Sequence, residues 1–160
     1  MHTTSRQYRQ DLPPSVVRAI DDAWKLVGTW LGEDSLRAPA VLLMDSQADT
    51  IRVVRDGTVT MADFERRVLE LARTVSFDQA VLVGRSAVGD SGDVVSAQPV
   101  AGGHTEQVAV VAFANASGRR ELQMARLQLI DGVASLGHIT SMPMPVCLVD
   151  QLLAQRVTVH

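Results

Sequence analysis

The sequence predicts an α+β domain: an antiparallel β-sheet, made of a meander plus a small hairpin, with two main helices packed on one face and a short C-terminal helix. Apolar residues recur at helical spacing in residues 13–32 and 60–75. From Asp78 onward the pattern changes to period two and β-branched residues dominate. The 160 residues, 46% of them hydrophobic, suffice for one core. We expect a flexible arm over residues 1–12 and a single domain over residues 13–160.

The first helix is predicted over residues 13–32, because prolines at its start and Gly32 at its end are typical helix boundaries. Trp30 lies off the apolar stripe of this helix. We therefore expect an exposed tryptophan near the helix end, where this residue type commonly anchors a protein partner. The stripe predicted to face the core contains Val17, Ile20, Trp24, Val27 and Leu31.

A small hairpin is predicted from the apolar run at residues 40–44 and the alternating residues 51–55. Asp45, Ser46 and Asp49 predict a turn between these strands, and Asp56-Gly57 would close the hairpin. An exposed edge strand at residues 51–55 would offer a pairing surface to a second copy of the chain.

The second helix is predicted to begin at Thr60, with Asp63 three residues later as in a capped helix start. Its other polar residues are predicted to face water, on the side of the helix opposite an apolar stripe that would face the sheet. That stripe contains Phe64, Val68, Leu71 and Val75.

The second half of the chain predicts a four-strand antiparallel meander, over residues 80–88, 93–100, 107–115 and 121–130. Residues 119–130 are ambiguous because they include strong helix formers, and we predict a strand. Leu122 and Met124 are out of phase with Leu127, which would require a bulge near Ala125. Residues 141–145 are predicted to be extended or looped, and residues 147–155 to form a closing helix.

The charge and composition argue against several classes of partner. A net charge of −3 provides no positive field to attract nucleic acid or an anionic membrane surface. The longest apolar run, residues 108–114, is far shorter than the roughly 20 residues that a membrane span needs. A single cysteine, Cys147, cannot form an internal disulfide, and residues 1–11 do not resemble a signal peptide. We expect a cytoplasmic protein.

One pattern suggests metal chemistry. His104-Thr105-Glu106, followed by Pro145-Val146-Cys147 and then Asp150, resembles in its order the zinc deaminases of nucleobases, which carry H-x-E and P-C-x-x-C. The resemblance implies zinc held by His104 and Cys147, with Glu106 shuttling protons. The chain departs from the pattern, because a residue separates Pro145 from Cys147 and Asp150 replaces the second thiolate. In that family H-x-E also opens a helix, whereas residues 107–115 predict a strand.

A second metal hypothesis adds His138, which with His104 and Glu106 would supply three ligands and leave a fourth position for water. On a strand, His104 and Glu106 would point to the same face. The alternative interpretation makes both histidines solvated turn residues and Cys147 a buried, inert thiol. Zinc is implied only by these metal hypotheses, and the sequence otherwise implies no cofactor.

The sequence carries no complete catalytic signature, so we expect a non-enzymatic binding or assembly module that acts through its surface. Met142 and Met144 lie in an apolar segment where adaptable side chains would favour protein contacts, together with Trp30. The expected partner is a protein or a second copy in a homodimer. Two alternatives remain open: a metal-dependent hydrolase or deaminase-like enzyme using His104 and Glu106, and a sensor of a small ligand.

Overall fold

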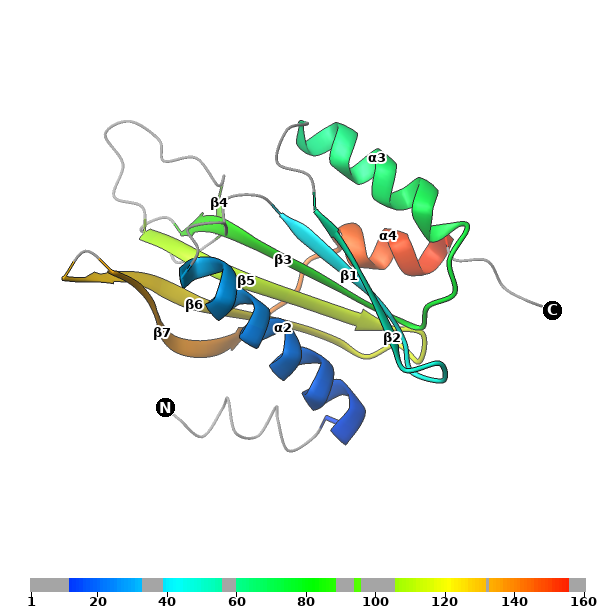
Figure 1. Cartoon of the computed structure of the whole chain (residues 1–160), viewed down its shortest axis with the longest axis horizontal. Helices are drawn as coiled ribbons and strands as arrows, with labels where there is room; N and C mark the ends of the chain where they lie inside the picture. Colours follow the sequence, from blue (N-terminus) through cyan, green and yellow to red (C-terminus); the bar gives the residue numbers. More distant parts are fainter. Residues whose placement is uncertain are drawn as a thin grey trace.

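The computed structural model describes residues 12–32, 39–55, 60–88, 94–95, 106–131 and 133–155, and shows a β-sheet flanked by helices (Figure 1). None of the described helices is long and apolar enough to cross a membrane. Of the predicted arm over residues 1–12, only Leu12 belongs to the described residues. In chain order the elements are α2 (Pro14–Gly32), β1 (Ala40–Asp45), β2 (Thr50–Arg55), α3 (Met61–Ala72), β3 (Gln79–Val88), β4 (Val94–Val95), β5 (Glu106–Asn115), β6 (Arg120–Ile130), β7 (Val133–Met142) and α4 (Leu148–Gln155).

All strand pairings are antiparallel, and the strands lie in the order β2-β1-β3-β5-β6-β7. The predicted α+β class, with an antiparallel sheet, two main helices and a short C-terminal helix, is confirmed. The strand order of the meander differs from the prediction at one place. Strand β3 pairs along its length with β5, whereas β4 pairs only with the end of β3. Strand β7 was not predicted. It extends the sheet beyond β6.

Helices cover both faces of this sheet (Figure 1). On β1, Leu42 packs in the cluster formed with α2, whereas its neighbours Val41 and Leu43 pack in the cluster formed with α3 and α4. Because side chains alternate along a strand, these clusters lie on opposite faces, which we call the α2 face and the α3/α4 face. The prediction that both main helices share one face is therefore wrong. The central strands are apolar on both sides, so each side requires a cover.

Helix α2 lies across its face with a broad buried stripe. Three predicted stripe residues, Ile20, Trp24 and Val27, are buried, and Val17 and Leu31 lie at the border of the contact. The indole Nε1–H of Trp24 donates a buried hydrogen bond of 2.8 Å to Oε1 of Gln123 on β6. This bond satisfies two polar groups that would otherwise be costly to bury and ties the helix to a central strand.

Helix α3 begins as predicted at Thr60, whose Oγ1 accepts a hydrogen bond of 3.2 Å from the backbone N–H of Asp63. The capping hydroxyl satisfies one of the N–H groups that the first helical turn leaves without an intrahelical acceptor. Phe64, Val68 and Ala72 form the buried side of the helix and pack on the α3/α4 face.

The β1–β2 hairpin turns at residues 46–49, where the sequence predicted a turn. The Asp45 carboxylate accepts backbone hydrogen bonds from Gln47 (3.0 Å) and Ala48 (3.2 Å). Together with the Ser76 side chain, these donors lower the pKa of Asp45, the Ala48 N–H having the largest effect. Asp49 adopts a φ of 54°, a left-handed conformation that aspartate tolerates better than most residues. Asp56-Gly57 lies outside the described residues.

The ambiguous segment 119–130 forms strand β6. Its ladder with β7 shifts between Ala125 and Leu127, where the sequence predicted a bulge. The extra residue lies in β7, however, because Ala125 pairs with Ile139 and Leu127 pairs with Leu136. Leu122 faces the α3/α4 cluster, whereas Ala125 faces the α2 cluster. The apolar residues of β6 are out of phase with each other because both faces of the strand are buried.

Candidate functional site

The proposed metal ligands are only partly within the described residues. His104 lies outside them, and Glu106 begins β5 with a side chain that is not described. His138 is exposed on β7, and Cys147 is half-buried just before α4. In the described part of the chain, no three His, Cys, Asp or Glu side chains are grouped closely enough to hold a metal ion. A site that includes His104 and Glu106 stays a prediction, and Glu106 opens a strand rather than a helix.

Cys147 lies in a surrounding that suppresses thiolate formation. Burial is the largest influence on its pKa and raises it, with the Asp150 carboxylate acting in the same direction. A thiol is a good nucleophile only as the thiolate, whose formation a raised pKa opposes. The Cys147 side chain packs against the α3/α4 cluster, which agrees with the interpretation of Cys147 as an inert, partly buried thiol.

The start of α4 is fixed by an ion pair between Arg120 and Asp150. Arg120 Nε donates to Asp150 Oδ1 at 2.8 Å, and Nη2 donates to Oδ2 at 2.9 Å. The same carboxylate accepts the backbone N–H of Cys147 at 2.9 Å, and Arg120 Nη2 also donates to the carbonyl of Pro145 at 3.2 Å. Asp150 thus has a structural role. It links Arg120, the first residue of β6, to the loop before α4.

These hydrogen bonds lower the pKa of Asp150, with the Arg120 side chain as the largest cause. A carboxyl with a lowered folded-state pKa stabilises the fold fully above its unfolded pKa of about 3.9, and this stabilisation is lost as the pH falls through the folded value. We predict that Asp150→Asn lowers the free energy of unfolding by about 1 kcal/mol at neutral pH and by progressively less below about pH 4. Urea denaturation across that pH range measures this difference.

Asp131→Asn is the matched control, because Asp131 is an exposed carboxylate in the β6–β7 turn. Its effect should stay within about 0.5 kcal/mol at every pH. A difference between Asp150→Asn and the parent protein that does not change with pH would contradict a stabilising charge on Asp150.

Met142 and Met144, predicted as binding residues, are half-buried and pack against the α3/α4 cluster. Their packing favours a role in covering the core rather than an exposed contact surface. Val146 between Pro145 and Cys147 is 79% exposed and is the apolar side chain of this segment most open to solvent.

Trp30 is buried rather than exposed, with 8% of its surface accessible. It belongs to the α2 cluster, and the guanidinium carbon of Arg55 lies 4.1 Å from the centroid of its ring. A guanidinium at this distance is attracted to the electron-rich face of the indole. The prediction of an exposed Trp30 is therefore wrong, because the buried stripe of α2 is wider than the stripe taken from the sequence.

Strand β2, which Arg55 ends, forms one edge of the sheet. Its residues Ile51 and Val53 pair with Met44 and Leu42, and therefore lie on the α2 face. Helix α2 does not cover them, since Ile51 is 52% exposed and Val53 is 45% exposed. We call Ile51, Val53 and Arg55 the β2 edge surface. It presents two apolar side chains and one arginine beside backbone groups that no described strand pairs on the outer side.

No family model, curated protein or solved structure matches this chain.

Proposed function

We propose that this domain is a binding and assembly module that pairs with a second copy of itself through β2. The observation that supports this proposal is the β2 edge surface, where Ile51 and Val53 are about half exposed on an edge strand. An edge strand with apolar side chains and unpaired outer N–H and C=O groups is a ready template for a further strand. The proposal concerns association and assigns no reaction to the domain.

The sequence of β2 is self-complementary in one antiparallel register. A two-fold axis perpendicular to the sheet keeps both α2 faces on the same side, and an axis through Val53 places Val53 opposite its copy. Ile51 then lies opposite Arg55 of the other copy, and Arg52 lies opposite Val54. No two like charges face each other directly, and the apolar residues of both edges form a continuous strip.

The alternative register with the axis through Arg52 is disfavoured by charge. It would place the two Arg52 side chains directly opposite each other, and like charges in that position are destabilising. It would also separate the two Val53 side chains. The position of the arginines in β2 therefore favours the Val53-centred pairing over the Arg52-centred one.

We predict that Val53→Glu weakens self-association by roughly 100-fold. Each copy loses the additional burial of a half-exposed valine, about 1 kcal/mol, and two glutamates then face each other at a cost of about 1 kcal/mol. The total of about 3 kcal/mol corresponds to two factors of ten. Sedimentation equilibrium over a concentration series measures the dissociation constant, and circular dichroism checks that the variant is folded.

Val133→Glu is the matched control, because Val133 is a 65% exposed valine on the opposite edge strand, β7. It should associate like the parent protein. A parent protein that stays monomeric at every concentration, or a Val133→Glu variant that dissociates while Val53→Glu does not, would refute assembly through β2.

A further inference from the structure

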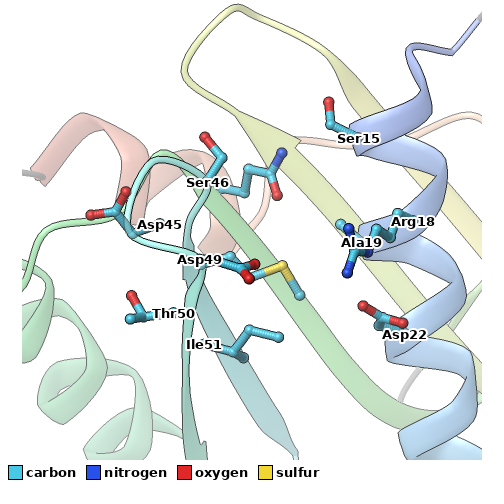
Figure 2. Close-up of a pocket in the computed structure, with 11 residues that line it drawn as sticks. Ser15, Arg18, Ala19, Asp22, Asp45, Ser46, Asp49, Thr50 and Ile51 are labelled. Atoms are coloured by element: carbon cyan, nitrogen blue, oxygen red, sulfur yellow. The ribbon is translucent and has the colours of Figure 1, made fainter.

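A groove separates the first half of α2 from the β1–β2 hairpin on the α2 face (Figure 2). Its volume is about 160 Å³, roughly the space that five water molecules occupy in the liquid. Met44 and Ile51 give it an apolar wall, while Arg18, Asp22, Asp49 and Gln79 add polar groups. The groove is too small for a drug-sized molecule and suits a compound of a few non-hydrogen atoms.

Gln79 is the buried polar group of this groove. It is the first residue of β3, lies between Met44 and Asn115 in the sheet, and is only 7% exposed. Its side-chain amide forms no hydrogen bond with any of the described residues. The amide atoms of Gln79 are not fully buried and remain open to solvent in the groove, so they offer a hydrogen-bonding group to a small occupant.

Charges of both signs reach the groove from its two sides. In Figure 2 the guanidinium of Arg18 on α2 points toward the hairpin, and the carboxylate of Asp49 at the hairpin points toward α2. Neither group forms an ion pair with the other or with any other described side chain. Asp22, one helical turn after Arg18, adds a second carboxylate on the helix side and is 4.0 Å from Lys25. The space between the helix and the hairpin thus has an anion-binding group facing a cation-binding one.

Two other polar residues of the groove, Asp45 and Ser46, are committed to the hairpin. Asp45 holds the backbone of Gln47 and Ala48, and its side chain points away from α2 in Figure 2. The backbone N–H of Ser46 donates to Asp78 at 2.9 Å, and its hydroxyl also bonds that carboxylate. The charged and amide groups left to contact an occupant are therefore Arg18, Asp22, Asp49 and Gln79, with the hydroxyls of Ser15 and Thr50 at the same groove.

We propose that this groove binds a small zwitterion of the α-amino-acid class. The ligand carboxylate pairs with Arg18, its ammonium group lies between Asp49 and Asp22, and the Gln79 amide bonds either end. A short side chain contacts Met44 and Ile51. The volume of about 160 Å³ suits a short side chain such as that of alanine or serine. This site shares Ile51 with the β2 edge surface, but ligand binding does not depend on the assembly proposed through β2.

Titration of ¹⁵N-labelled protein with L-alanine, followed by NMR, tests this inference. We expect saturable shifts of the amide signals of residues 18, 49 and 79 at millimolar ligand. Arg18→Gln and Asp49→Asn should each weaken binding about tenfold or more, because each removes a charged partner. Asparagine tolerates the left-handed conformation of residue 49, so the turn should persist. Arg67→Gln on α3, on the other side of the sheet, is the control and should bind like the parent protein.

Gln79→Leu distinguishes a ligand-binding amide from a structural one. The Gln79 amide forms no hydrogen bond with the described residues, so replacing it by an apolar group of similar shape should leave the thermal midpoint unchanged or raise it, while L-alanine binding weakens. A lowered midpoint with unchanged binding would overturn the role of Gln79. Acetate and methylammonium, which each carry one of the two charges, should bind at least tenfold more weakly than L-alanine. Equal binding of either one, or no saturable shift with L-alanine, would overturn the zwitterion site.

Discussion

Replacement of Phe113 by alanine should lower the free energy of unfolding by about 3–5 kcal/mol, the largest loss of stability that we predict for one substitution. Phe113 is fully buried on β5 and belongs to the cluster between the sheet and α2. Its neighbour on the same face of β5, Val111, is a stiff β-branched residue already packed in this cluster, so it cannot fill the cavity. Domains of this size lose about 2–4 °C of thermal midpoint per kcal/mol, which predicts a decrease of roughly 6–20 °C.

Val146→Ala provides the control for this prediction, because Val146 is 79% exposed. It should change the free energy of unfolding by no more than about 0.5 kcal/mol. Hydrogen exchange gives an independent check, since α2 should lose more protection than α3 when Phe113 is truncated. A loss below about 1 kcal/mol, or equal loosening of both helices, would mean that α2 does not close over Phe113.

The helices and most strands of this fold follow from patterns of a few residues. Thr60 with Asp63 predicted the start of α3, and the cap is present. The β-branched runs that became β3 and β5 alternate or remain apolar over lengths that suit strands rather than helices. Such patterns involve only residues that are close in the sequence, so they can be recognised without knowledge of the tertiary structure.

The placement of helices on both faces was missed although β5 carried its signal. Residues 108–114 are all apolar, and a strand that reads as a continuous apolar run is typically buried on both sides. These residues were predicted as a strand, but the apolar character of both sides of that strand was not taken as a signal. It requires a helix on each face and so places α2 and α3 on opposite sides.

Strand β7 was missed because its sequence lacks a clear period. Ser135, Gly137 and His138 interrupt its apolar residues, and its side chains are half-buried or exposed throughout. The extra residue opposite the Ala125–Leu127 step also breaks the alternation. An edge strand with a bulge leaves little pattern in the sequence, and its identity comes from the pairing with β6.

The contacts that define the candidate sites could not be predicted, since they join distant parts of the chain. Trp30 meets Arg55, which lies 25 positions later in the sequence, and this contact reflects how far α2 extends toward the sheet edge. The groove joins Arg18, Asp49 and Gln79 from three elements, each of them an ordinary polar residue in its local sequence. By contrast, the sequence did predict an exposed edge strand at residues 51–55. The alternation of residues within a single strand is visible without knowledge of distant contacts.

An engineered cysteine in β2 should form an intermolecular disulfide almost completely, and this is the second large effect that we predict. In the Val53-centred register the two residues 53 lie directly opposite each other, where antiparallel strands bring Cα atoms within about 4.5–5.5 Å. Disulfides form when Cα atoms are about 4.4–6.8 Å apart. Residues 52 of the two copies are diagonal to each other at about 7–8 Å, which is beyond that range.

The most direct test of assembly through β2 therefore compares Val53→Cys with Arg52→Cys, each combined with Cys147→Ser so that one thiol remains per chain. Both variants are oxidised with glutathione at a concentration where the parent protein associates, and the fraction of disulfide-linked dimer is measured on non-reducing gels. We predict near-complete crosslinking through residue 53 and little through residue 52. Equal crosslinking of both variants, or none through residue 53, would contradict pairing of two copies along β2.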